Sequence, residues 1–88
     1  MENDKSLFIE DRIKIIIAGV LFVEKDKVRN DALLDKDLGT DCLDKAVIQM
    51  NLEDAFDIVI PDKDMADKNK VSEIIDYIRK ITDATVPR

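Results

Sequence analysis

The residue best suited to chemistry in this chain is Cys42, the single cysteine among 88 residues. It lies in a short run that combines a glycine, a hydroxyl residue and two aspartates, Gly39-Thr40-Asp41-Cys42-Leu43-Asp44. A thiol can act as a nucleophile, and a histidine is its usual activating base. The chain contains no histidine, which excludes a Cys–His pair and every histidine-based metal site. We therefore expect no independent catalysis and no metal centre.

The helix that follows Cys42 has to position it. Asp41 is a natural N-cap for a helix over residues 42–57, because its side chain can accept a hydrogen bond from the first turn. At 100° per residue this helix has two apolar stripes on nearly opposite sides. The first stripe comprises Leu43, Ala46, Val47 and Met50. The second comprises Ile48, Leu52, Ala55 and Phe56. We expect one stripe to enter the core and the other to face a different surface.

The first stripe is a candidate docking surface. If it stays open to solvent, it is a small apolar patch ringed by four acidic residues, Asp44, Glu53, Asp54 and Asp57. Residues 35–67 hold ten acidic against three basic residues, a net charge of −7, whereas residues 1–34 carry −1 and residues 68–88 carry +2. A concentrated field of one sign steers a partner of the opposite sign. Two plainer interpretations stay open: the acids serve solubility, or a short third helix covers the patch.

Three further helices complete the predicted frame. Apolar residues spaced by three and four predict a first helix over residues 7–21 and a last helix over residues 71–81. Residues 22–41 have no sustained period and should form a long loop, which is often functional in a small domain. The apolar run 58–60 meets a proline, which predicts an extended link before one or two helical turns at residues 62–67. The expected fold is therefore all-α: a four-helix bundle with a long first loop and a short third helix.

Length and charge narrow the function classes. Eighty-eight residues predict one domain, 1–88, with a core over about residues 7–81. A net charge of −6 argues against nucleic acid as a partner, because phosphate neutralisation needs a basic stripe. The longest apolar runs are too short to span a bilayer, the first residues lack the pattern of a secretory leader, and a single cysteine suits a reducing compartment. We expect a monomeric cytoplasmic protein without a membrane span.

The motifs around Cys42 are typical of one family. The string from Asp37 to Asp62, DLGTDCLDKAVIQMNLEDAFDIVIPD, resembles the prosthetic-group segment of acyl carrier proteins. The usual hexapeptide of that family reads Gly-x-Asp-Ser-Leu-[Asp/Glu]. Further similarities are Ile60-Pro61-Asp62 and, in the last helix, Asp76-Tyr77-Ile78. The resemblance covers roughly residues 7–81 and implies the four-helix bundle of that family.

The resemblance also implies a function, the shuttling of acyl chains between enzymes of fatty-acid synthesis. In that family the serine hydroxyl carries 4′-phosphopantetheine, whose terminal thiol holds the acyl cargo as a thioester. Here that position is Cys42, flanked by Gly39, Asp41 and Leu43. Basic patches of fatty-acid synthesis enzymes, acyltransferases and phosphopantetheinyl transferase would contact the acidic second helix. By position the contact residues would be Asp41, Leu43, Asp44, Ala46, Val47, Met50, Glu53, Asp54 and Asp57.

Cys42 separates this chain from the usual pattern. Transfer of the arm to sulfur would give a phosphorothiolate ester, a weaker linkage, so we expect no covalent cofactor in the chain as written. Cys42 could replace serine in an ordinary carrier, accept the arm on sulfur in a divergent one, mark a non-carrier acidic interaction module, or have no chemical role. A carrier of aminoacyl or peptidyl groups is a further alternative, closer to an acyl carrier than the interaction module is. Gln49 and Lys68 also stand where the family is usually apolar, and Phe22 where glycine is frequent.

Overall fold

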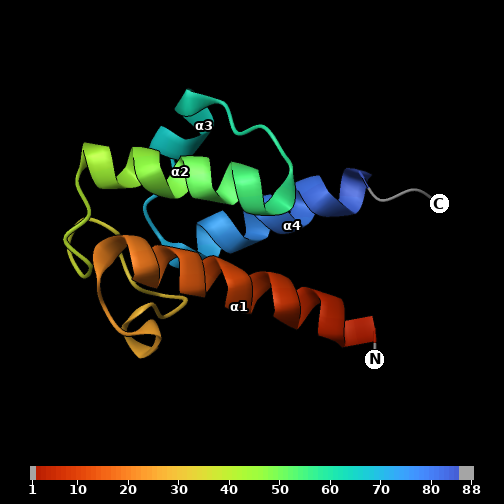
Figure 1. Ribbon diagram of the computed structural model, residues 1–88, viewed down its shortest axis with the longest axis horizontal. Helices are drawn as coiled ribbons and strands as arrows, with labels where there is room; N and C mark the ends of the chain where they lie inside the picture. Colours follow the sequence, from red (N-terminus) through yellow and green to blue (C-terminus); the bar gives the residue numbers. More distant parts are fainter. Residues whose placement is uncertain (1, 86–88) are drawn as a thin grey trace.

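The computed structural model describes the backbone of residues 2–85 and the side chains of residues 8–82. The described elements are α1 (Glu2–Leu21), the 3₁₀ turn η1 (Lys25–Lys27), α2 (Cys42–Phe56), α3 (Asp62–Ala66) and α4 (Val71–Thr85). Figure 1 shows α1 and α2 running along the molecule with α4 between them in this view, and the short α3 beside α2. The all-α expectation, with a long first loop and a short third helix, is confirmed.

The helix ends differ from the prediction mainly at the two outer ends. α1 begins at Glu2 rather than at residue 7, and α4 ends at Thr85 rather than at residue 81. These extra turns are rich in polar residues and carry no periodic apolar signal, so periodicity could not find them. α2 and α3 each end one residue earlier than expected, which is the ordinary uncertainty of a helix end.

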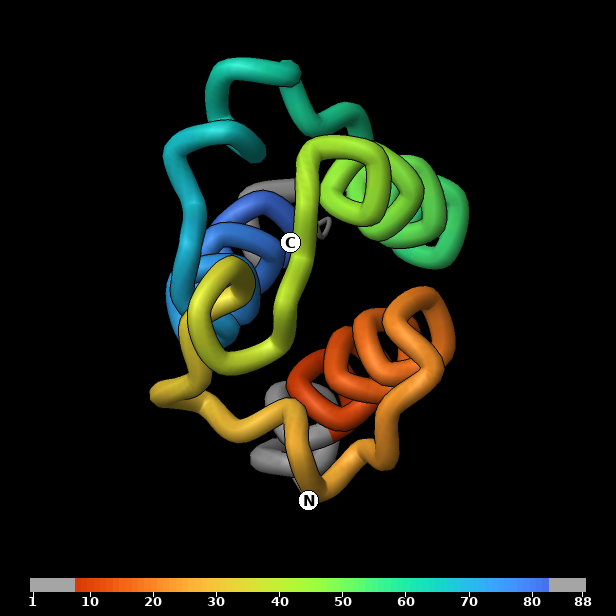
Figure 2. Tube along the Cα trace, turned by 90° about the vertical axis from the view of Figure 1, so that its left-hand side faces the viewer, coloured from red at the N-terminus to blue at the C-terminus, as the bar shows by residue number. Residues whose placement is uncertain are grey.

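The core is aliphatic and draws on all four helices and the first loop. Its buried residues are Ile9, Ile13, Ile17, Ala18, Val28, Ala32, Leu34, Ile48, Leu52, Ile60, Met65, Val71, Ile74, Ile75 and Ile78. Burying one large apolar side chain is worth about 1.5–3 kcal/mol. Viewed along the bundle, α1 and α2 lie on one side and α4 on the other (Figure 2). This shared core fixes the direction of α2, and hence the surface on which Cys42 lies.

The long first loop is fastened to the start of α4. Leu34 N donates to Asn69 O at 2.7 Å, and Val71 N donates to Ala32 O at 3.1 Å. Within the described residues one isolated β-bridge occurs, an antiparallel pairing of Leu33 with Lys70. Such bonds satisfy backbone groups that a buried loop would otherwise leave unpaired. The loop therefore enters α2 from a fixed point.

α1 and α2 end in the same way. Phe22 follows α1 with φ 58° and Asp57 follows α2 with φ 55°, both in the left-handed region. In each case the next residue donates a hydrogen bond back into the last turn, Val23 N to Ala18 O and Ile58 N to Glu53 O, both at 3.1 Å. Aspartate tolerates this conformation better than most residues. A phenylalanine there is unusual, because the position favours glycine.

Candidate functional site

Cys42 is the first residue of α2, and its thiol is free and exposed. Asp41 caps the helix: its Oδ1 accepts a hydrogen bond from Asp44 N at 2.8 Å. Gly39 has φ 67°, a left-handed conformation that most side chains disfavour. The glycine and the capping aspartate of the motif therefore each have a geometric role, and together they bring the sulfur to the surface at the start of the helix.

The Thr40 hydroxyl, the other potential nucleophile in this turn, is not accessible from solvent. Thr40 N donates to Leu34 O at 2.8 Å, which ties the turn to the first loop. The Thr40 Oγ1 atom is buried and has no hydrogen-bond partner. A reagent approaching the turn from solvent therefore meets the sulfur of Cys42 and not the hydroxyl of Thr40.

The two stripes of α2 divide between core and surface. Ile48 and Leu52 are fully buried. The other stripe, Leu43, Ala46, Val47 and Met50, is exposed, and we call it the outer α2 stripe. The exposed fractions of Leu43, Val47 and Met50 are 77%, 44% and 65%. α3 does not cover these side chains, so the interpretation of a covered patch is wrong.

Four of the five predicted acidic residues stand beside the outer α2 stripe in accessible positions. Asp41, Asp54 and Asp57 are exposed, and Asp44 is half-buried. Glu53 is different, since its Oε2 accepts a hydrogen bond from Ile60 N at 2.7 Å. One oxygen of this carboxylate therefore holds the α2–α3 connection in place. Nothing in the spacing of acids along the helix distinguishes Glu53 from its neighbours.

Polar side chains fasten α3 to α2. Gln49 Nε2 donates to Ile60 O at 2.8 Å and to Asp62 Oδ1 at 2.9 Å. Lys45 Nζ donates to Ala66 O at 3.2 Å, at the last turn of α3. The positive charge of Lys45 is therefore directed toward α3. These contacts give Gln49 a structural role.

A second polar seam joins α3 to α4. Tyr77 Oη donates to Asp64 Oδ2 at 2.7 Å, and Lys68 Nζ lies 4.7 Å from the centroid of the Tyr77 ring. Burial, followed by the hydrogen bond to Asp64, raises the pKa of Tyr77 to about 12. The hydroxyl therefore keeps its proton at neutral pH and remains the donor. No sequence pattern indicates this pair, because the two residues lie on different helices.

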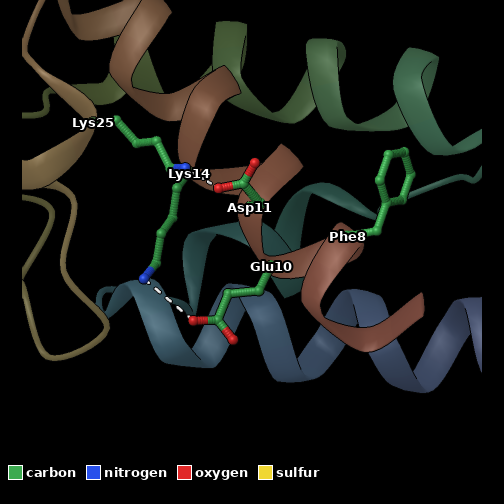
Figure 3. Close-up of a pocket in the computed structure, with 5 residues that line it drawn as sticks. All are labelled: Phe8, Glu10, Asp11, Lys14 and Lys25. Atoms are coloured by element: carbon green, nitrogen blue, oxygen red, sulfur yellow. Dashed lines mark hydrogen bonds and ion pairs between the residues drawn. The ribbon is translucent and has the colours of Figure 1, made fainter. Parts of the chain in front are cut away.

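A hollow on the α1 side of the molecule is not a comparable site. It has a volume of about 460 Å³ and is lined by Phe8, Glu10, Asp11, Lys14 and Lys25. Its charges pair with one another: Lys14 with Glu10 at 3.2 Å, and Lys25 with Asp11 (Figure 3). Among residues 8–82, whose side chains the structure describes, no cluster of three or more His, Cys, Asp or Glu is placed to hold a metal ion. No helix among residues 2–85 is long and apolar enough to cross a membrane.

Comparison with known proteins places this geometry in a family. A family model described as a phosphopantetheine attachment site matches residues 11–78. An acyl carrier protein of Akkermansia muciniphila is 40% identical over 73 residues, which cover 83% of this chain and 91% of that protein. The chain belongs to the acyl carrier protein family. An acyl carrier protein of Buchnera aphidicola subsp. Acyrthosiphon pisum is 44% identical over 72 residues, 82% of this chain and 90% of that relative. Members of this family carry acyl chains on phosphopantetheine, typically in fatty-acid synthesis.

Proposed function

We propose that this chain is an acyl shuttle whose arm position is Cys42 and whose docking surface is the outer α2 stripe with its acids. The proposal rests on one observation: Cys42 and the outer α2 stripe lie on the same helix. The exposed Cys42 directly precedes Leu43, the most exposed of the large apolar residues of the stripe. A partner that binds along the stripe therefore has the attachment position within its contact area. The chain itself performs no reaction and serves as a non-catalytic cytoplasmic carrier.

The scaffold fits a phosphopantetheine arm, and the nucleophile does not. Cys42 is accessible at a capped helix start, which leaves room for an attached group. When bound, the arm supplies a flexible thiol that holds acyl cargo. The family linkage, however, joins phosphate to a hydroxyl oxygen, and this chain offers sulfur at that position while the Thr40 hydroxyl is buried. The chain as written is therefore proposed to remain without the arm.

The docking surface is suited to weak, rapidly reversible binding. Each exposed ion pair with a basic patch on a partner contributes only about 0.2–1 kcal/mol. Asp41, Asp54 and Asp57 are exposed, so the charges of Lys and Arg on a partner can reach them. Salt screens such interactions over about 10 Å at 0.1 M. Proposed partners are enzymes of fatty-acid synthesis, acyltransferases and the transferase that loads the arm. Because the summed free energy of these ion pairs is modest, the carrier can dissociate from its partner after delivery.

The proposal is tested by loading. The chain, Cys42→Ser and Cys42→Ala are each incubated with coenzyme A and a broad-specificity phosphopantetheinyl transferase, and intact masses are measured. We expect a mass gain of one arm in Cys42→Ser and none in the other two. As a matched control, Thr40→Ala in the Cys42→Ser background should still gain the arm.

Other outcomes have defined meanings. A mass gain in the parent chain that disappears in Cys42→Ala supports carriage of the arm on sulfur. It contradicts only the proposal that the parent chain remains without the arm. If no variant gains the mass of the arm, carriage is contradicted. The result then favours an acidic interaction module, one of the alternatives that Cys42 raises. A loaded Cys42→Ser protein that accepts aminoacyl groups but no fatty acyl group from the corresponding ligases contradicts the assignment of the cargo.

A further inference from the structure

Asn69, in the link between α3 and α4, forms hydrogen bonds through both its backbone and its side chain. Its backbone N donates to Glu73 Oε1 at 3.0 Å, and its backbone O accepts from Leu34 N at 2.7 Å. Its side-chain Oδ1 accepts from Asp35 N at 3.3 Å, while its Nδ2 donates to Asp35 Oδ1 at 3.1 Å. Asn69 therefore joins the first turn of α4 to the first loop.

The Asp35 carboxylate is held ready to accept the Asn69 amide. Its Oδ1 also accepts a hydrogen bond from Lys36 N at 2.6 Å. The bond from Asn69, helped by the one from Lys36 N, outweighs desolvation and lowers the pKa of Asp35. The carboxylate is therefore ionised at neutral pH. A hydrogen bond to an ionised acceptor is stronger than one between neutral groups, so this contact is favourable although Asp35 is exposed.

A single peptide unit connects this pair to the turn before Cys42. The N–H of Asp35 and the C=O of Leu34 belong to the same planar group, and they point in opposite directions. On one side Asp35 N donates to Asn69 Oδ1, and on the other side Leu34 O accepts from Thr40 N at 2.8 Å. The side chain of Asn69 therefore orients the acceptor to which Thr40, two residues before Cys42, is bonded.

The turn before Cys42 depends on backbone bonds for its path. Gly39 has no side chain to pack, and no atom of the described residues lies within 4 Å of the position that a Cβ would occupy there. The Thr40 Oγ1 atom has no hydrogen-bond partner among the described residues. The bond from Thr40 N to Leu34 O is therefore the polar contact that attaches Thr40 to the first loop.

We propose that Asn69 is a positioning residue for the arm-attachment position: its side chain fixes the Leu34–Asp35 peptide unit and, through Thr40, the turn that presents residue 42. This inference rests on the proposed function, in which residue 42 receives the arm. The bond between Leu34 N and Asn69 O is made by backbone atoms, so it survives truncation of the Asn69 side chain. Truncation therefore frees the peptide unit while the loop stays fastened to α4.

Single-turnover loading tests this role in the Cys42→Ser background, with a phosphopantetheinyl transferase and coenzyme A. Asn69→Ala should lower the maximal rate of arm transfer by about 2- to 10-fold, the range expected for one hydrogen bond. The half-saturating concentration should not change, because the outer α2 stripe is intact. Lys70→Ala keeps the backbone bond from Lys70 N to Glu73 Oε1 and should leave both values unchanged. An unchanged maximal rate in Asn69→Ala overturns the proposal.

Exchange of the two side chains tests the contact itself. Asn69→Asp alone places two carboxylates together, so the maximal rate should fall. Adding Asp35→Asn restores one amide and one carboxylate with their roles exchanged, and the rate should return to within about twofold of the reference. Ile78→Val, a buried change in α4, controls for a general loss of stability. No recovery in the exchanged pair, or an equal loss of rate in Ile78→Val, overturns the proposal.

Amide hydrogen exchange measures the turn without any loading. In the parent chain, Asn69→Ala should speed exchange of the Thr40 N–H by about 2- to 10-fold. The N–H of Leu52, in the core of α2, should change only as far as the free energy of unfolding changes. Unchanged exchange at Thr40 overturns the inference even if loading falls. If Cys42→Ser gains no arm at all, the proposed function fails, and exchange at Thr40 alone decides whether Asn69 orients the turn.

Discussion

Two exposed apolar surfaces, the outer α2 stripe and a second set at α1, look alike by exposure and differ in their electrostatic surroundings. The second set, which we call the α1 stripe, comprises Phe8, Ile15 and Phe22, the last of which lies one residue beyond the end of α1. Each places large apolar side chains in solvent on one side of a helix. Around the outer α2 stripe, Asp41, Asp54 and Asp57 are exposed. On α1, Asp11 is paired with Lys25, and Glu10, on the side of the helix that faces α4, is paired with Lys14. The two surfaces are therefore equally open to solvent, and they differ in the acidic charge that is left unpaired around them.

The helix ends reinforce this contrast. The outer α2 stripe begins at a well-capped helix start, where Asp41 accepts from Asp44 N. The α1 stripe finishes at Phe22, in a conformation that suits glycine. The start of α2 therefore has favourable local structure, whereas the end of α1 carries a local backbone cost at Phe22.

The largest expected effect separates surface from core on α2. Leu52→Ala should lower the free energy of unfolding by about 2–5 kcal/mol, because it leaves a cavity in the core. Leu43→Ala should change it by less than about 0.5 kcal/mol, as is usual for exposed positions. Urea denaturation of both variants measures the difference. Equal losses would show that the outer α2 stripe is part of the packed core, which would remove the basis of the comparison.

An intermediate effect tests the charges around the outer α2 stripe. Asp54→Asn combined with Asp57→Asn should weaken binding of a phosphopantetheinyl transferase by about 2- to 30-fold, from two ion pairs of about 0.2–1 kcal/mol each. Both side chains are exposed, and asparagine tolerates the left-handed conformation at position 57. Titration calorimetry at two salt concentrations measures the effect, which should shrink at high salt. Phe8→Ser, on the α1 stripe, should leave this affinity unchanged.

The smallest expected effect concerns Glu10, a paired charge on the side of α1 that faces α4. Burial raises the pKa of Glu10, but hydrogen bonds from Lys14 and Asn30 and the charges of Lys14 and Arg79 outweigh it, so the pKa is lowered. A lowered pKa in the folded state contributes stability above about pH 4.5, and this is lost as pH falls through the folded value. The contribution should be below about 1 kcal/mol.

An NMR titration of the Glu10 side-chain carboxyl measures this directly. Arg79 Nη2 donates to Glu10 Oε1 at 3.0 Å, so Arg79→Gln should move the midpoint back toward the ordinary value. A Glu10 midpoint at or above the ordinary value in the parent chain would mean that Glu10 is not paired with Lys14 and Arg79 as described.

The sequence predicted the features that depend on periodicity and local chemistry. Steps of three and four between apolar residues located the helices, and the two stripes of α2 separated as Ile48 and Met50 indicated. The cap at Asp41 followed from the turn motif. The α1 stripe was missed because Ile15 lies in the continuous apolar run of residues 15–18, where an outward residue cannot be told from its buried neighbours.

Contacts between helices could not be predicted. The bonds of Gln49 to Ile60 O and Asp62 depend on how far α3 approaches α2. The commitment of Glu53 to the α2–α3 connection is likewise set by the path of that link. Residue type gives the capacity to form such bonds, but the partner is fixed only by tertiary packing.

The seam between α3 and α4 gives this protein an intrinsic optical reporter. Tyr77 is the single tyrosine, and the chain contains no tryptophan. Its ring contacts the Lys68 ammonium, and its hydroxyl donates to Asp64. Any event that parts the two helices moves this fluorophore into water and removes a carboxylate acceptor that quenches its emission. Opening of the bundle can therefore be followed in unlabelled protein, in real time, by ultraviolet emission alone.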